Sequence, residues 1–158
     1  MNDFKAPWSP SLKWMSWGTT FVLCAGAVAF AVMKLYLVAL LLPLVLLAAA
    51  PFTIRGYAIR GDRLVVHRLF WDTDLSLADL QAAESNPCAM KKSWRTAGNG
   101  GLFSFTGYFS NKALGDYRAL VTHPAHSVIL RFPAETVVVS PDSPEAFIQS
   151  ILGRNQRC

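Results

Sequence analysis

The chain has 158 residues, of which 53% are hydrophobic and only 16% are charged, an apolar balance for a soluble domain of this size. The formal net charge is +5, and the Lys and Arg residues are interspersed with Asp and Glu. A nucleic-acid-binding domain carries a stronger basic face, so this pattern argues against DNA or RNA as a partner.

The apolar residues are concentrated near the N-terminus. Two uncharged segments, residues 17–33 and residues 35–52, are separated by Lys34. Each segment reaches the length of about 17 residues that a helix needs to cross a bilayer. We therefore expect a transmembrane helical hairpin over residues 17–52, preceded by a juxtamembrane segment over residues 1–16.

Two other interpretations of the apolar region are weaker. A buried hairpin of a soluble protein would need a larger globular core to cover so long a stretch on all faces. A cleaved signal peptide is disfavoured because a second apolar segment follows the first at once. Retained membrane helices are the better prediction.

The charges beside the hairpin predict its orientation. Lys5 and Lys13 precede the first apolar segment, Arg55 and Arg60 follow the second, and only Lys34 lies in the turn. Basic residues near membrane helices mark the cytoplasmic side. We expect a multi-pass protein of the inner membrane with both termini in the cytoplasm.

Three cysteines, Cys24, Cys88 and Cys158, show no spacing typical of a metal site or a disulfide framework. They are expected to be unpaired thiols in a reducing compartment. No metal or cofactor is predicted.

The remaining residues, 53–158, are predicted to form a β-rich domain that ends in a helix. Apolar and β-branched runs separated by turn residues indicate about seven strands. Residues 102–105 are among the segments that could pair as a strand. Ser143, Pro144 and Glu145 suit the start of an amphipathic helix, and Gly153 suits its end. The apolar face of this helix is expected to consist of Phe147, Ile148, Ile151 and Leu152.

This domain resembles the bacterial pleckstrin-homology-like (PH-like) families, particularly the short membrane-anchored group. The resemblance covers nearly all of residues 53–158 and is carried by five segments in order: residues 55–59, 64–71, 95–104, 114–117 and 137–142. It implies an all-β, seven-stranded PH-like barrel capped by a C-terminal α-helix. It says little about the ligand, because one fold hosts many functions.

One basic, glycine-rich stretch is the candidate site for an anion or a lipid headgroup. Glycines allow backbone N–H groups to turn inward around an anion, and nearby cations favour a phosphate. The candidate residues are Lys91, Lys92, Arg95, Gly98, Gly100 and Gly101. The alternative is a flexible turn with a solvated basic flank. The resemblance also implies a second possible headgroup site, the first strand hairpin with Arg60, Arg63 and Arg68, but Asp62 at the tip of this hairpin disfavours it.

No catalytic group of residues is apparent. His123 and His126 lack further metal ligands nearby in sequence, and Asp72 and Asp74 are more typical of solvated strand charges. We therefore expect a non-enzymatic interaction or scaffolding module, anchored in the membrane, that binds an unidentified protein partner or itself. An anionic headgroup binder or sensor is the alternative.

Overall fold

The computed structural model describes residues 2–153. Ten strands, three α-helices and two short 3₁₀ turns are assigned within this range. In chain order they are β1 (Asn2–Lys5), α1 (Pro10–Val32), α2 (Tyr36–Ala49), η1 (Ala50–Phe52), β2 (Ile54–Arg60), β3 (Arg63–Arg68), β4 (Asp72–Ser76), β5 (Ala82–Ser85), β6 (Trp94–Gly100), β7 (Phe105–Asn111), β8 (Gly115–Val121), η2 (Pro124–His126), β9 (Val128–Arg131), β10 (Thr136–Val139) and α3 (Pro144–Leu152).

The N-terminal residues belong to the β domain. Strand β1 pairs antiparallel with β2, with Asn2 opposite Ile59 and Lys5 opposite Gly56. Gly56 permits this approach, since a Cβ there would lie 2.9 Å from the carbonyl oxygen of Phe4. Residues 1–16 were expected to be a separate juxtamembrane segment, but residues 2–5 are a sheet strand and the first helix begins at Pro10.

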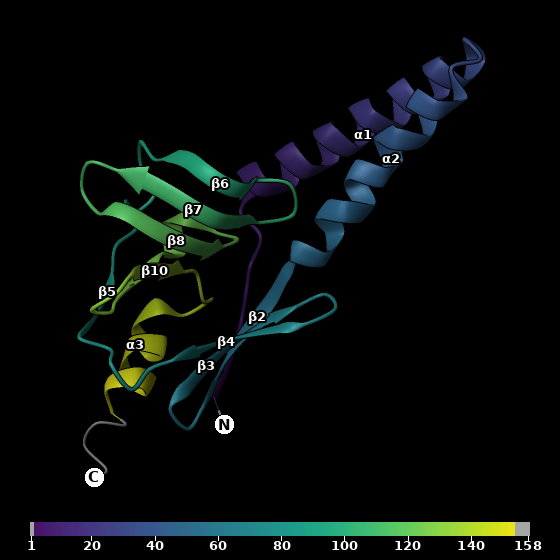
Figure 1. Cartoon of the computed structure of the whole chain (residues 1–158). Helices are drawn as coiled ribbons and strands as arrows, with labels where there is room; N and C mark the ends of the chain where they lie inside the picture. Colours follow the sequence, from purple (N-terminus) through teal and green to yellow (C-terminus); the bar gives the residue numbers. More distant parts are fainter. Residues whose placement is uncertain (1, 154–158) are drawn as a thin grey trace.

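Helices α1 and α2 form an antiparallel arm that projects away from the sheets (Figure 1). The Ser9 side chain caps α1 by accepting a hydrogen bond of 3.1 Å from the Leu12 backbone N–H, and Pro10 suits the first turn. This cap explains why the helix starts seven residues before Trp17. Leu12 and Ser16 are buried against the domain, whereas most of the arm is exposed.

The two helices differ in length. Within residues 2–153, α1 is the one helix that is long and apolar enough to cross a membrane, and α2 with η1 is shorter. The second predicted span, residues 35–52, is thus only partly α-helical. Helix α2 ends at Ala49, because Pro51 lacks the N–H that an α-helix needs. The length criterion therefore supports one spanning helix where two were predicted.

The strands form two sheets and not one closed barrel. The first sheet has the order β1-β2-β3-β4, and the second has the order β5-β9-β10-β8-β7-β6. Strand β10 lies between β8 and β9 and runs parallel to β8. Strands β1 and β4 are the edges of the first sheet, and β5 and β6 are the edges of the second. The prediction of a β-rich domain with a C-terminal helix is confirmed, and the prediction of a closed barrel is wrong.

The main core lies between the two sheets and α3. Alternate residues of β10 point to opposite faces, so Val137 and Val139 join this core while Val138 joins a second cluster that includes Phe109 and Tyr117. The second sheet is therefore buried on both faces near β10, which explains the uninterrupted apolar run of that strand.

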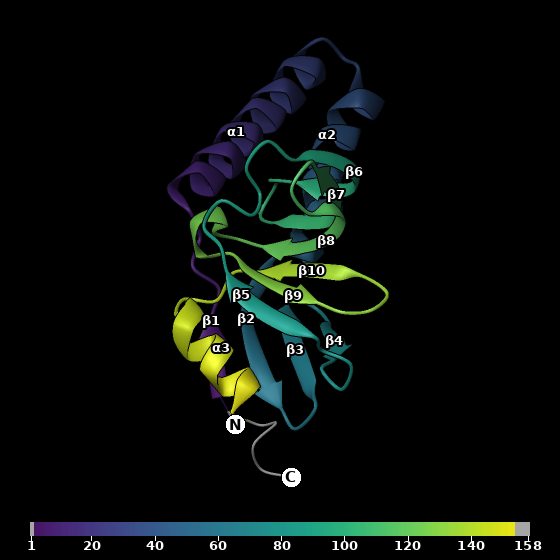
Figure 2. The same cartoon turned by 90° about the vertical axis from the view of Figure 1, so that its left-hand side faces the viewer.

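Helix α3 lies at the end of the β domain remote from the arm (Figures 1 and 2). Its predicted limits agree with the structure, although the Ser143 side chain makes no capping hydrogen bond. Phe147 and Ile151 are buried, and Phe147 meets the ring of Phe4 edge-on at 5.1 Å. Leu152, expected on the apolar face, is 48% exposed.

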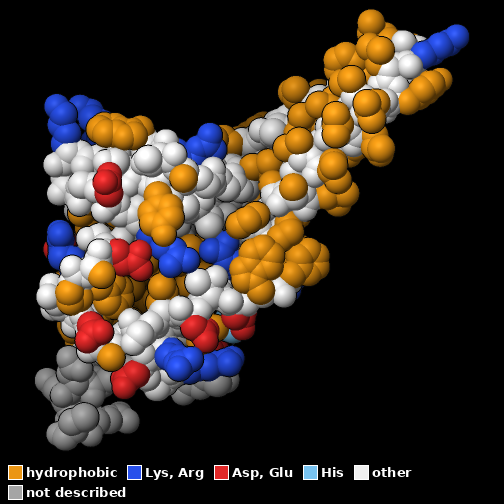
Figure 3. All heavy atoms as spheres, in the orientation of Figure 1, with side chains coloured by type: hydrophobic (Ala, Val, Ile, Leu, Met, Phe, Trp, Pro, Cys, Tyr) orange, Lys and Arg blue, Asp and Glu red, His pale blue; other side chains and the backbone are white. Residues whose placement is uncertain are grey.

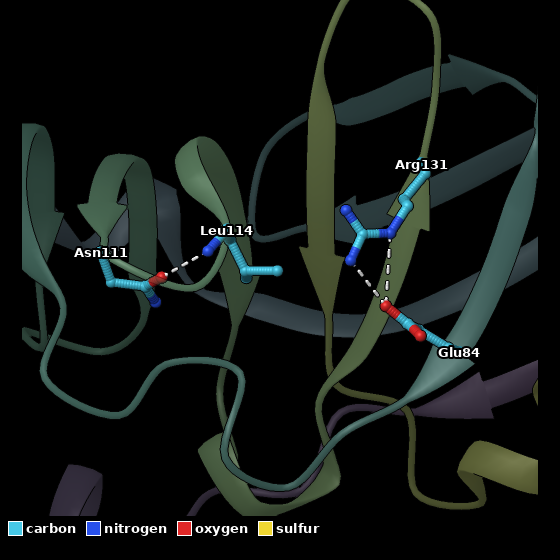
Figure 4. Close-up of polar contacts among 4 residues, drawn as sticks. All are labelled: Glu84, Asn111, Leu114 and Arg131. Carbon is cyan, nitrogen blue, oxygen red and sulfur yellow. Dashed lines mark hydrogen bonds and ion pairs between the residues drawn. The ribbon is translucent and has the colours of Figure 1, made fainter.

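Side chains also fix the strand connections. The side-chain oxygen of Asn111 accepts a hydrogen bond of 2.8 Å from the Leu114 N–H and closes the β7–β8 turn (Figure 4). Arg131 on β9 donates to Glu84 on β5 at 2.9 Å and joins two neighbouring strands (Figure 4). Residues 102–105 were expected to pair as a strand, but residues 102–104 belong to the turn between β6 and β7, and Phe105 is the first residue of β7.

Candidate functional site

The six residues of the predicted anion site do not form one cluster. Lys91 and Lys92 lie in the turn before β6, and Gly98 and Gly100 lie toward the other end of that strand. At about 3.3 Å per strand residue, β6 extends roughly 13 Å from Trp94 to Gly98, and the two lysines lie in the turn before Trp94. The two lysines are therefore remote from the glycines with which the sequence grouped them.

The glycines allow close pairing of β6 with β7. Gly98, with φ of +102°, lies opposite Gly107, with φ of +136°. A Cβ on Gly98 would collide with the Thr106 carbonyl oxygen and lie 2.7 Å from the Gly107 Cα. The Gly101 N–H already donates to the Ser104 carbonyl at 3.1 Å. Close backbone contact thus accounts for Gly98, and the Gly101 N–H has a partner within the turn.

Arg95 is the one predicted cation that lies beside these glycines. Its Nη1 donates a hydrogen bond of 3.1 Å to the Gly98 carbonyl oxygen. This places the guanidinium at the edge of a cavity of about 690 Å³ between the end of α2 and the face of β6, β7 and β8.

Three arginines from three different strands line this cavity: Arg68 of β3, Arg95 of β6 and Arg118 of β8. The opposite wall is apolar, with Val45, Ala48 and Ala49 of α2 beside Phe52; other lining residues are Ala97, Gly98, Asn99, Leu102, Thr106, Gly107 and Tyr108. Among residues 2–153, no acidic side chain lines this cavity. Figure 3 shows Lys and Arg side chains where the apolar arm meets the β domain.

Arg68 is the most buried of the three, with 8% of its surface exposed. Its Nε donates to the Thr73 hydroxyl at 3.0 Å, and its guanidinium carbon lies 5.8 Å from the ring centres of both Phe52 and Trp71. Its Nη1 is buried and has no hydrogen-bond partner within the described part of the chain. Burial, followed by the positive charge of Arg118, lowers the pKa of Arg68. Arg68 is therefore a largely desolvated cation beside a like charge.

Comparison with known families identifies the domain. The profile of the family described as Bacterial PH domain matches residues 55–155, which is more than half of the chain. The chain belongs to this family. No curated protein and no solved structure matches the chain significantly. The resemblance drawn from the sequence is confirmed at the level of the family.

In this bacterial PH domain the first strand hairpin does not gather its arginines. Arg60 and Arg63 are paired at the turn between β2 and β3, and Arg63 lies 3.6 Å from Asp74. Arg68 is opposite Ile54 at the other end of the same hairpin. Arg60, Arg63 and Arg68 therefore cannot bind one headgroup together.

The PH domain holds the helical arm at several points. The Ser16 Oγ of α1 accepts a hydrogen bond of 2.9 Å from the Phe103 N–H, and Ser104 donates 2.9 Å to the Phe52 carbonyl at the end of η1. The Ser9 N–H donates to the Thr122 carbonyl at 3.1 Å. The β6–β7 turn is thus fastened to the bases of both helices.

The remaining polar candidates have structural partners or too few ligands. Among residues 2–153, no group of three or more His, Cys, Asp or Glu side chains is arranged to hold a metal ion. His123 and His126 stack with ring centres 4.2 Å apart. Asp72 pairs with His67 at 2.9 Å, and Asp74 faces Arg63.

The sequence pointed to Arg95 and Gly98 but missed the cavity that they line. In the sequence, Arg68 belongs to the first strand hairpin, and no motif marks Arg118. The one local signal is that each of these arginines interrupts or ends an apolar strand, since Arg118 stands between Tyr117 and Ala119. Their meeting depends on contacts between sheets that sequence spacing does not encode.

Proposed function

We propose that this chain is a membrane-anchored PH-type interaction module at the cytoplasmic face of the inner membrane. The observation that carries the proposal is the arm of α1 and α2, whose apolar side chains are exposed along both helices (Figure 3). Large contiguous apolar surfaces mark membrane or partner contacts. A bilayer would cover this arm on all sides.

The attachment of the arm supports insertion from one side. Strand β1 precedes α1 and pairs with β2, which follows α2. Both ends of the hairpin are therefore held in one domain on the same side of the bilayer. Lys5 precedes the arm, Lys13 lies near the start of α1, and Arg55 follows the arm, whereas Lys34 is the cation of the turn; the basic excess therefore favours the cytoplasm for the side of the domain.

The length of the arm is compatible with a span. At 1.5 Å per residue, the 14 residues of α2 extend about 21 Å, and η1 adds about 6 Å. The hydrocarbon core is about 30 Å thick. Lys34 at the turn can extend its ammonium to the far interface, and slight local thinning of the bilayer compensates for the remainder.

Cysteine labelling tests the anchoring. Cys24 is exposed on α1 and Cys88 is exposed on the domain. For the test, Cys158, which lies outside the described residues, is first replaced by serine. Two variants each keep one of these thiols. A membrane-impermeant maleimide should label Cys88 in inverted vesicles but not in intact cells, and Cys24 only after denaturing detergent dissolves the membrane. Labelling of Cys88 from outside would reverse the orientation, and release of the chain by carbonate washing would refute anchoring.

An exposed edge strand supports the interaction role. Strand β6 ends the order of the second sheet, and most of its residues are exposed, including Trp94 at 58%. Unpaired strand edges accept strands of other chains. A photo-crosslinking residue at Trp94 should give a discrete adduct in membranes, whereas the same residue at the exposed Lys112 should not. Equal adducts at both positions, or none at either, would contradict a specific interface at β6.

Recognition of an anionic headgroup is the second candidate function. The observation that favours it is the arginine-lined cavity beside α2, to which Arg95 and Gly98 contribute and from which Lys91 and Lys92 are absent.

A further inference from the structure

We infer that the cavity lined by Arg68, Arg95 and Arg118 binds the phosphate of an acidic phospholipid whose acyl chains lie against the end of α2. The inference rests on the proposed membrane anchoring, because only then does α2 meet lipid at this level. It assigns a ligand class to a site that differs from the tip of the first strand hairpin.

The guanidinium of Arg68 is buried and only partly hydrogen-bonded. Buried polar groups in proteins are almost always hydrogen-bonded, and a buried charge without a partner is costly. The aromatic rings of Phe52 and Trp71 lie beside the guanidinium, and Thr73 takes the Nε–H, but the buried Nη1 remains without a partner. The guanidinium groups of Arg68, Arg95 and Arg118 all line the cavity, and a phosphate is a suitable ligand for them, since guanidinium groups bind phosphate in a planar, bidentate geometry.

The charge of the cavity also requires an anion. The three arginines take part in none of the ion pairs found among residues 2–153, which involve Arg63, His67 and Arg131. The positive charge of Arg118 acts directly on Arg68. A phosphate between them would convert this repulsion into attraction in surroundings of low polarity.

The shape of the cavity favours a lipid over a free phosphate. Its volume of about 690 Å³ is within the range of about 300–1,000 Å³ for small-molecule sites and far exceeds the needs of one phosphate. Val45, Ala48 and Ala49 of α2 form a wall without polar side chains. A ligand with an anionic head and an apolar tail matches both walls at once.

A second cavity at the base of the arm provides a comparison. Its volume is about 530 Å³, and its lining includes Trp8, Trp17, Pro43, Leu46 and Phe103. None of the described residues that line it is basic. Lipid contact alone explains an apolar hollow of this kind. The arginine-lined cavity differs by its cations, so we place headgroup recognition there and not in the second cavity.

The test uses the full chain in nanodiscs and measures the lipids that it retains, by native mass spectrometry after transfer to detergent. Discs contain phosphatidylglycerol and phosphatidylcholine in equal amounts. The chain should retain phosphatidylglycerol in preference. Replacing Arg95 and Arg118 by glutamine should weaken this retention about thirtyfold, the factor for two cations near a membrane surface. The control double variant, Arg63→Gln with Arg131→Gln, removes the same amount of charge outside the cavity and should preserve the preferential retention of phosphatidylglycerol.

Buried Arg68 is tested separately by Arg68→Lys, which keeps the charge but loses the planar donors. Retention should fall while the circular dichroism of the domain stays unchanged. Equal retention of both lipids, or equal loss in the cavity and control double variants, would overturn the inference. Arginine-dependent binding of glycerol phosphate as tight as that of phosphatidylglycerol would overturn the assignment to lipid. Failure of the chain to enter discs would instead refute the anchoring proposal.

Discussion

The hydroxyl of Tyr57 on β2 donates a hydrogen bond of 2.6 Å to the carbonyl oxygen of Leu120 on β8 and so joins the two sheets. The Ser140 N–H donates to the same hydroxyl at 3.2 Å. Burial, partly offset by the hydrogen bonds to Ser140, raises the pKa of Tyr57 to about 12, so the neutral phenol is the form that the core holds.

The first prediction is that Tyr57→Phe destabilises the domain. The substitution leaves the buried Ser140 N–H and Leu120 carbonyl without this partner, which should lower the free energy of unfolding by about 1–3 kcal/mol. Denaturant unfolding of the full chain in mild detergent measures it. Tyr108→Phe is the control, because the Tyr108 ring is 54% exposed. Equal effects of the two substitutions would show that the hydrogen bond between the sheets contributes nothing.

The second prediction concerns the contact of α3 with the core. Phe147 is fully buried and meets Phe4 and Tyr57, so Phe147→Ala should lower the free energy of unfolding by about 3–5 kcal/mol. Leu152→Ala on the same helix is the control, since Leu152 is half exposed. A loss below about 0.5 kcal/mol for Phe147→Ala, typical of surface sites, would mean that α3 is not packed through this ring.

Local patterns predicted the elements that short-range chemistry controls. The limits of α3 follow from Pro144 and Gly153, and the hairpin of β2 and β3 follows from the turn at Gly61. Strand β1 escaped prediction because its partner β2 follows only after the entire helical arm. Four residues such as Asn2–Lys5 carry no periodicity that indicates a strand by itself.

The candidate site was predicted only in part for a related reason. Lys91 and Lys92 precede Arg95 closely in sequence, but the extended strand β6 carries the glycines away from the two lysines. Arg68 and Arg118 are 50 positions apart in the chain and meet because β3 and β8 belong to sheets that pack together. Spacing along a sequence cannot report such a meeting without knowledge of the sheet order.

The third prediction is a loss of stability in mild acid. Burial and then the charge of His126 lower the pKa of His123 in the folded state. Because the unfolded chain binds the proton more readily, the contribution of neutral His123 is fully present above its unfolded pKa of about 6.5 and is lost as the pH falls below that value through the lower folded-state pKa. The free energy of unfolding should drop less between pH 7.5 and pH 5 in His123→Gln than in the unchanged chain. Parallel pH profiles would contradict this.

The last prediction tests why β6 contains glycine at position 98. A methyl group there would collide with the Thr106 carbonyl oxygen, and φ of +102° is unfavourable for any L side chain. Gly98→Ala should therefore lower the free energy of unfolding by about 1–3 kcal/mol, the usual cost of a strained backbone position.

Gly100→Ala is the matched control, because a Cβ there would meet only the movable side chain of Arg95 at 3.2 Å. If Gly98 serves the close pairing of β6 with β7, Gly98→Ala should increase hydrogen exchange at the amides of both strands, and Gly100→Ala should leave the exchange nearly unchanged. If the glycines serve instead as an inward-facing anion nest, the two substitutions should have the same effect on hydrogen exchange and should weaken phosphate binding equally. The geometry of Gly98 against Gly107 favours the first result.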